Sequence, residues 1–551
     1  MNRVVLAIVG VMMGLVLAAG VLVIVVIVGG DGDGGGGGNG DGGGPATNEL
    51  RLRGPEPITL DPHLITDASS ALYVVEIFGG LLTLDLDLQI QPDLAEDTPT
   101  EENGGKVVND DGTVTYTFRL RNDAQFHDRK PVRAQDVKFS LERAADPATQ
   151  SLGAGFFLAD IVGVTEKLRG EAEEISGVQV IDDLTIEITI DRDLPNFLFK
   201  LTYPTAFVVD RQQIERDQNW SRRPNGTGPY RLKEWEFGNR IILEANERYH
   251  LGAPHVATVR YRLLGTSITL YEAGDVDVAG VGLDDLERVQ DPNDPLNAEY
   301  RNGSQLTISY LGFNVNVPPF DDPLVRRAFA MAIDKDEIVN ILFQGAIPAA
   351  NSILMPGLPA YNEDAQAPQF DPEGAMELLQ QSRYWGTEVL EDISLAESGA
   401  GGSASSALEV ILGDWQEHLG IEVIPEQALV SEFFQNVEQG IYQMYLLAWI
   451  MDYPAEENLL NLHFDSEAAN NYIGYRNPEV DRLLRQALTE QDPETRVALY
   501  QQAEKLILDD VPWFPLFFDR FHVLVKPYVK NYHIPQGIVP RLRFVTLEDD
   551  Q

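Results

Sequence analysis

The 551-residue sequence contains no cysteine, and this absence narrows the chemistry open to the chain. Without a thiol it forms no disulfide and offers no thiolate nucleophile or thiolate metal ligand. It also has no cysteine to which a lipid anchor could be attached. Disulfide and thiol chemistry are therefore excluded.

Basic residues are also scarce. Lys and Arg number 41 against 86 Asp and Glu, only 10 of the 41 are lysines, and the net charge is −45. Such a charge repels phosphate backbones and anionic lipid surfaces, so nucleic acid is not expected as a partner. The charge indicates a strongly solvated surface, suited to salt. A preference for cationic ligands is compatible with it but is not shown by bulk charge.

Motifs of catalysis are missing as well. The eight histidines show no zinc-protease spacing, and no Gly-x-Ser-x-Gly elbow, phosphate loop or dinucleotide fingerprint occurs. The segment Gly226–Pro229 is too short for a phosphate loop, and its proline lacks the N–H that would bind phosphate. Carboxylates are so numerous that the sequence does not exclude a catalytic pair of them brought together by the fold. The sequence predicts a protein that is not an enzyme and needs no metal and no cofactor.

The N-terminus holds the one long hydrophobic run. Val4–Val28 is uninterrupted apolar residues and glycine, longer than the core of a cleavable signal peptide and long enough to span a bilayer. We expect residues 1–28 to form a transmembrane helix, with Arg3 on the cytoplasmic side and the rest of the chain outside. The alternative is cleavage near Leu17–Gly20.

Residues 29–47 follow as a glycine-rich linker. Its Gly and Asp residues resemble a calcium repeat, but a flexible tether is the simpler interpretation. The remaining 500 or so residues suffice for about three lobes, since a domain typically has about 150 residues.

The body of the chain mixes strands and helices. Strict alternation predicts half-buried strands at Thr113–Arg121 and Leu184–Ile190. Helices are expected after Asp322-Pro323, Asn477-Pro478 and Asp492-Pro493, because each pair joins a capping side chain to a proline suited to the first turn.

The segment Gly399–Ser406 is rich in Gly, Ser and Ala and could be a linker. A helical pattern at Leu408–Leu419 and a short apolar run at Gly420–Ile424 follow it. A strand–loop–helix–strand unit fits this order better than a domain boundary.

Thirteen short motifs follow one another between about Leu50 and Pro540. They are Thr59–His63, Ile77–Leu82, Pro92–Glu96, Tyr116–Arg121, Phe126–Asp128, Asp136–Arg143, Gly226–Tyr230, Leu311–Asn314, Pro319–Pro323, Ala332–Lys335, Trp449–Pro454, Asn477–Asp481 and Pro512–Leu516. In this order the chain resembles the family 5 extracellular solute-binding proteins, which include the dipeptide- and oligopeptide-binding proteins of ABC transporters. Each motif is weak alone, and their shared order carries the resemblance.

The chain departs from the family pattern at two places. Arg129 stands where the family has glycine after His127-Asp128, and we expect it to reshape a surface turn only. Ala455–Glu457 replaces an acidic-proline continuation after Tyr453-Pro454. Because that segment lies near the ligand in the family, the class of ligand is in doubt.

The resemblance implies an α/β fold, the type II periplasmic-binding-protein-like two-lobed clamp with an additional domain. Ligand would bind in an interlobe cleft that closes by hinge rotation. Lobe I would comprise residues 48–88, 200–310 and 515–551. The additional domain would comprise 89–199, and lobe II 311–514.

The resemblance also implies which residues grip the ligand. The stretch Tyr445–Asp452 is a predicted strand ending in a carboxylate. Strand addition to Leu446–Ile450, including Ala448, would bind the peptide backbone, and Asp452 would bind the α-ammonium group. The alternative for Asp452 is a cap on the turn before Tyr453-Pro454.

Further residues match family positions near the ligand. Trp449 is predicted either to stack on the ligand or to join the core. Asp67 and Ala68 match a loop that contacts the peptide backbone, although an ordinary surface loop is the alternative. One of Phe517 and Phe518 is expected to face the ligand and the other the core.

The function implied is the extracytoplasmic, membrane-attached receptor of an ABC importer, which captures short peptides and delivers them to the transmembrane permease subunits. The cell membrane, with the binding domain periplasmic or at the cell surface, is the expected location. A nickel chelate, haem or an oligosaccharide are alternative ligands, because fold does not determine ligand. A cell-surface hydrolase is a less favoured alternative.

Overall fold

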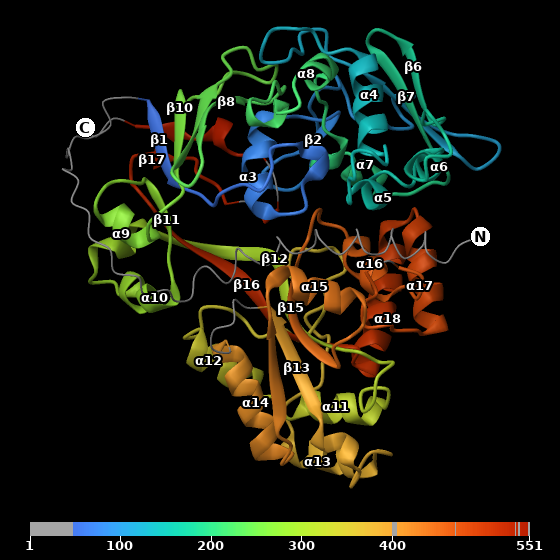
Figure 1. Cartoon of the computed structure of the whole chain (residues 1–551), viewed down its shortest axis with the longest axis vertical. Coiled ribbons are helices and arrows are strands. Elements are labelled where there is room, and N and C mark those ends of the chain that lie inside the picture. Colours follow the sequence, from blue (N-terminus) through green and yellow to red (C-terminus); the bar gives the residue numbers. More distant parts are fainter. Residues whose placement is uncertain (1–47, 399–404, 469, 535, 538–539, 549–551) are drawn as a thin grey trace. The chain divides into compact units, whose positions relative to one another are not determined.

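The computed structural model describes residues 48–398, 405–468, 470–534, 536–537 and 540–548 (Figure 1). The chain folds into two compact units, here called the terminal unit (described residues of 48–303 and 521–548) and the central unit (described residues of 304–520). The predicted anchor and linker, residues 1–47, lie outside the described residues. None of the helices in the described part combines the length and apolar character that crossing a bilayer requires.

The terminal unit contains a mixed sheet in the order β11-β1-β10-β9-β8 and an antiparallel sheet in the order β4-β5-β7-β6. Two short antiparallel pairs, β2-β3 and β17-β18, also belong to this unit. The strands are β1 Glu49–Arg53, β2 Leu82–Leu84, β3 Ile90–Pro92, β4 Lys106–Val108, β5 Val114–Arg119, β6 Val178–Asp182, β7 Thr185–Ile190, β8 Tyr230–Glu236, β9 Arg240–Ala245, β10 Thr258–Arg262, β11 Val278–Gly280, β17 Val529–Lys530 and β18 Thr546–Leu547.

Short helices connect these strands. They are η2 Pro62–Leu64, α3 Ala68–Ile77, α4 Ala134–Ala144, α5 Ala154–Phe157, α6 Val164–Leu168, α7 Phe197–Lys200, η3 Pro204–Ala206, α8 Arg211–Arg216, η4 Trp220–Arg222, α9 Ser267–Glu272, α10 Leu283–Gln290, η5 Pro295–Glu299 and η8 Leu542–Phe544. Helix α4 packs against β6 and β7 (Figure 1).

The central unit contains strands in the order β14-β13-β15-β12-β16. Its elements are β12 Tyr300–Phe313, α11 Pro323–Met331, α12 Lys335–Leu342, α13 Pro372–Gln381, η6 Glu388–Glu391, β13 Ile393–Ser398, α14 Ser406–His418, β14 Val423–Ala428, α15 Val430–Glu438, β15 Met444–Ile450, η7 Glu456–Asn458, α16 Leu460–Phe464, α17 Pro478–Thr489, α18 Pro493–Asp510 and β16 Trp513–Val525. Helices α16, α17 and α18 pack together in this unit (Figure 1).

The chain passes between the two units within β12 and β16, after residues 303 and 520. The predicted lobe boundaries at 310/311 and 514/515 fall in the same two strands. No turn or glycine-rich loop marks either crossing, because one strand continues through it. The division into lobes and an additional domain at 89–199 stays a prediction.

The alternating segments form the strands that their patterns predict. In β5 and β7 every second side chain is buried, and the two strands pair antiparallel with Tyr116 opposite Ile188. A period of two places one side-chain set on the core face and leaves the other partly exposed.

The capping pairs also begin helices as predicted. Asp322, Asn477 and Asp492 each accept a backbone N–H of the first turn, and a proline follows each of them. In α17 the apolar stripe that includes Leu484 and Ala487 is buried. The helix predicted at Leu408–Leu419 is α14.

The strand predicted at Gly420–Ile424 begins later, at Val423. Gly420 has φ = +67°, the left-handed conformation that ends a helix and that glycine adopts without strain. The chain needs these residues to leave α14 before it can pair with β13.

Arg129 occupies a left-handed turn with φ = +77°. An L-residue with a Cβ is strained there by about 1 kcal/mol relative to glycine. Replacing Arg129 by glycine is therefore expected to raise the free energy of unfolding by up to about 1 kcal/mol, because the strain removed exceeds the entropy that glycine adds to the unfolded chain. Urea denaturation of R129G and of the control R129A tests this. Equal gains for both variants would show that the Arg129 side chain, not the backbone conformation, is responsible.

Candidate ligand-binding site

Strand β15 has one edge bonded to β12. Met451 N–H donates to Leu306 O at 2.9 Å, and Asn314 N–H donates to Gln443 O at 2.9 Å. Both bonds join residues that lie directly opposite in the antiparallel register. Since hydrogen-bonded and non-bonded pairs alternate, the odd-numbered residues of β15 bond to β12.

The even-numbered residues Leu446, Ala448 and Ile450 therefore turn their N–H and C=O groups toward the opposite edge. In the described part of the chain, β13 meets that edge only at Tyr445. The backbone groups of Ala448 and Ile450 lie beyond this pairing. Leu446, Ala448 and Ile450, which were predicted to bind a peptide backbone, are thus three of the four residues of β15 whose backbone groups point away from β12; Met444 is the fourth.

Asp452 lies two residues after the end of β15 and is held by Asn458. The Asn458 amide oxygen accepts the Asp452 N–H at 2.9 Å, and its Nδ2 donates to Asp452 Oδ2 at 3.0 Å. Asn458 is fully buried, whereas Asp452 is partly exposed. A buried amide thus fixes the direction of this carboxylate before any ligand arrives. The sequence interpretation did not find Asn458, which directly follows the segment Ala455–Glu457 that departs from the family pattern.

The departing segment contributes structure. Glu456 Oε1 accepts the Ala360 N–H at 2.8 Å, and the Tyr453 hydroxyl donates to Glu457 Oε1 at 2.9 Å. Both glutamates are buried, and burial raises the pKa of Glu456. They hold the turn that carries Asp452 and Asn458.

The side chain of Trp449 lies on the face of β15 opposite to those of Ala448 and Ile450, in a group of aromatic rings. Its ring meets His463 edge-on with centroids 4.4 Å apart. His463 lies 4.8 Å from Trp513, which stacks on Tyr310 at 3.5 Å. These contacts support the packing role for Trp449, and stacking on a ligand stays a prediction.

Phe517 and Phe518 also have partners within the central unit. The Phe517 ring lies 4.9 Å from Phe343, and the Phe518 ring lies 6.5 Å from Tyr361. Phe518 N–H donates to Pro348 O at 3.1 Å. Which of the two faces a ligand stays a prediction.

Asp67 and Ala68 belong to the terminal unit, at the start of α3. Asp67 caps this helix, because its Oδ1 accepts Ser70 N–H at 2.7 Å, and Ala68 is the first helical residue. Asp67 is only 4% exposed, whereas Ala68 is partly exposed. Contact with a peptide stays a prediction for both.

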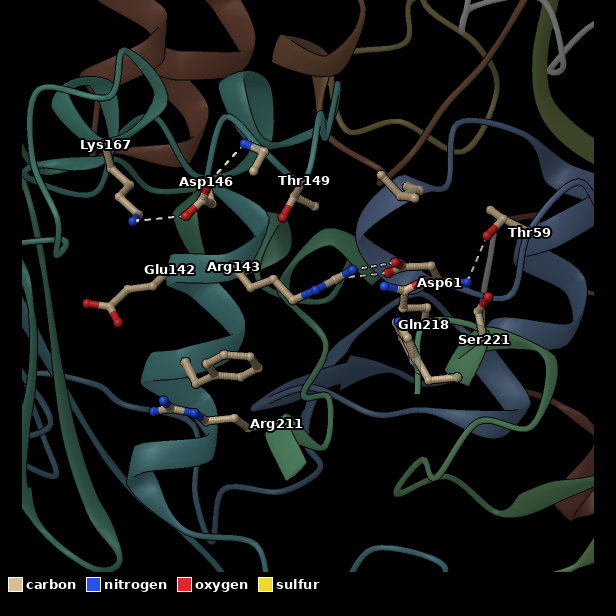
Figure 2. A pocket seen from close by; sticks show the side chains of 14 residues that line it. Thr59, Asp61, Glu142, Arg143, Asp146, Thr149, Lys167, Arg211, Gln218 and Ser221 are labelled. Carbon is tan, nitrogen blue, oxygen red and sulfur yellow. Dashed lines mark hydrogen bonds and ion pairs between the residues drawn. The ribbon is translucent and has the colours of Figure 1, made fainter. Parts of the chain in front are cut away.

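A cavity of about 680 Å³ opens in the terminal unit beside α4 (Figure 2). Its basic groups already have partners: Arg143 binds Asp61, Lys167 binds Asp146, and Arg211 binds Glu215. No predicted ligand residue lines it. Its charged groups therefore serve the fold, and we assign it no ligand.

His63 lies next to this cavity, where its two ring nitrogens have different partners. Nδ1 accepts from Arg143 Nη1 at 2.8 Å, so Nε2 carries the proton and donates to Phe207 O at 3.0 Å. Burial is the main cause that lowers the pKa of His63 to about 4; the Asp61 carboxylate opposes this shift and the Arg143 guanidinium adds to it.

His63 is expected to make the protein sensitive to acid. An unfolded histidine takes up a proton near pH 6.5, whereas the folded His63 does so near pH 4, so stability is lost as the pH falls between these values. Between pH 7 and 4.5 this loss is about 2–3 kcal/mol. Urea denaturation across this range should show a smaller loss for His63→Gln. Because buried carboxylates oppose this trend, the test is the difference between the two proteins. An unchanged difference across the range would contradict the prediction.

No group of three or more His, Asp or Glu side chains that could hold a metal ion occurs among the described residues.

The fold is that of the periplasmic binding proteins. The solved structure of the periplasmic binding protein DppA from Helicobacter pylori, in complex with peptide STSA, matches 91% of this chain and 98% of its own with a TM-score of 0.75 and 23% identity. The family model "Bacterial extracellular solute-binding proteins, family 5 Middle" matches residues 89–471. The chain therefore belongs to the family 5 bacterial extracellular solute-binding proteins, which confirms the resemblance drawn from its motifs.

Two curated relatives from Escherichia coli (strain K12) are equally similar. One is a probable deoxycholate-binding periplasmic protein, YgiS, 29% identical over 502 residues, which cover 88% of this chain and 90% of that protein. The other is the periplasmic oligopeptide-binding protein OppA, 29% identical over 507 residues, which cover 88% and 89%. Family membership therefore supports a receptor for a solute.

Proposed function

We propose that this chain captures short peptides outside the cytoplasmic membrane and delivers them to the transmembrane subunits of an ABC importer. The observation that carries the proposal is the part of the β15 edge that lies beyond its pairing with β13, followed by a carboxylate held in place. Ala448 and Ile450 turn their backbone groups toward this edge, and Asp452 follows two residues later.

This arrangement suits groups that all peptides share. A peptide in extended conformation would add to the edge through its own N–H and C=O groups. Asp452 lies two residues beyond Ile450, in the bend that follows the strand. The α-ammonium group would donate to the Asp452 carboxylate and set the register, and side chains would contribute little to it.

Attachment to the membrane is part of the proposal. Val4–Val28 is long and apolar enough for an anchor, and the glycine-rich residues 29–47 would let the receptor move near its permease. No cofactor or metal is needed for capture.

A second candidate is a receptor for a non-peptide solute. A relative named for deoxycholate binding is as similar as the relative named for oligopeptides. Ala455–Glu457 also departs from the family pattern close to Asp452. A single small molecule in the purified protein would favour this candidate.

The test is mass spectrometry of the small molecules released when protein purified from cells is denatured. A mixture of short peptides would support peptide capture. One bile acid, sugar, chelate or tetrapyrrole would overturn it while leaving a solute receptor. If nothing is released, saturable binding of a tripeptide by calorimetry decides the same question.

A further inference from the structure

A second cavity, of about 240 Å³, lies in the central unit between α18 and the segment 362–366. It is separate from β15 and from Asp452. Polar side chains and one buried leucine form much of its wall: Asn362, Gln366, Gln501, Glu504 and Leu508.

Glu504 is the buried charged group of this cavity. It is only 2% exposed, because its helix α18 packs the neighbouring Ala503 and Ile507 into the core. Its Oε1 accepts the N–H groups of Ile353 and Leu354 at 2.8 and 2.7 Å. Within the described ranges, Oε2 has no hydrogen-bond partner, although Glu504 lines the cavity.

No basic side chain neutralises this carboxylate in the described part of the chain. Lys505 is the one basic residue among those that line the cavity, but it is 74% exposed and its Nζ binds Asp509 Oδ2 at 2.8 Å. Asp364 adds a further negative charge at the wall. Burial raises the pKa of Glu504 to about 7, which reflects the cost of holding a buried carboxylate without a cation.

The dimensions and the donor set point to one class of cation. The cavity volume is several times the share of one water, about 30 Å³, and the described residues hold no cluster of three acidic or histidine side chains for a divalent metal ion. Leu508 offers an apolar wall beside the carboxylate. An ammonium group with a short alkyl chain fits the volume of the cavity, and it matches a carboxylate that stands beside an apolar wall.

We propose that this cavity binds a small primary alkylammonium ion. The ammonium group donates to Glu504 Oε2 in a charge-assisted hydrogen bond, and the methylene groups contact Leu508. The amide side chains of Asn362 and Gln501 lie around the bound cation.

The test is isothermal titration calorimetry of the whole protein with n-butylammonium chloride at pH 8 and constant ionic strength. Saturable binding at one site is expected. Glu504→Gln is expected to weaken it at least tenfold, because the amide keeps an acceptor for Ile353 and Leu354 but removes the charge. Ala365→Phe, at the partly exposed wall, is expected to weaken it by filling the cavity, and it tests the site even if Glu504→Gln fails to fold.

Controls separate this site from the proposed peptide site. Asp452→Asn should bind the amine as the unmodified protein does, and 1-butanol should not bind. The proposal is overturned if binding is absent, if either cavity variant binds with unchanged affinity, or if Asp452→Asn abolishes binding. Equal binding of 1-butanol, or saturable binding of potassium in place of the amine, would also overturn it.

Discussion

Replacing Asp452 by asparagine is expected to weaken the binding of a tripeptide more than a hundredfold. The α-ammonium group of the peptide would lose its charged acceptor, and removing one member of a charge pair that ligand binding buries costs about 3–5 kcal/mol. The amide keeps the size of the carboxylate and can still accept from Asn458 Nδ2. Calorimetry with one defined tripeptide measures the change.

Two controls make this result specific. Asp336→Asn removes the same charge from an exposed position at the start of α12 and should leave the affinity unchanged. An N-acetylated form of the peptide should bind the unmodified protein weakly. Its affinity for Asp452→Asn should be no lower than its affinity for the unmodified protein. If Asp452→Asn binds the free peptide within threefold of the unmodified protein, Asp452 does not receive the ammonium group.

Replacing Arg143 by methionine is expected to lower the free energy of unfolding by about 3–5 kcal/mol. Arg143 binds both carboxylate oxygens of Asp61, at 3.0 and 2.6 Å (Figure 2). It also donates to His63. Asp61 is 4% exposed, so the substitution leaves a buried carboxylate without its cation. The guanidinium also lies over the Trp220 ring, 5.3 Å from its centroid. Urea denaturation measures the loss.

A matched variant and a double variant show whether the buried charge is the cause. Arg211→Met breaks an exposed pair with Glu215 and should cost less than about 1 kcal/mol. Adding Asp61→Asn to Arg143→Met should recover part of the loss, because no uncompensated charge remains. A loss no larger for Arg143→Met than for Arg211→Met would contradict the prediction.

The local elements follow from local patterns. The alternation in β5 and β7 and the capping pair Asp322-Pro323 are each encoded within a few consecutive residues, and the structure confirms them. The strand predicted to start at Gly420 starts three residues later, at Val423, because its start depends on pairing with β13. Pairing joins segments that are far apart in sequence.

The ligand site was likewise predicted only in part from the sequence. The sequence alone indicated the strand that ends in Asp452, the absence of thiol chemistry and, through the order of thirteen motifs, the family. It did not indicate that the odd-numbered residues of β15 bond to β12, because this alternation depends on the register with a strand more than 130 residues earlier. It also did not distinguish the core from the ligand for Trp449.

The tertiary structure alone decided which side chains hold others in place. Asn458 binds Asp452 across a turn, Arg143 reaches Asp61 from a helix 82 residues later, and Glu504 binds backbone groups 150 residues earlier. Composition and periodicity report whether a residue is apolar or charged and which face it occupies. They do not report which buried polar group meets which partner, because that depends on how distant segments pack together.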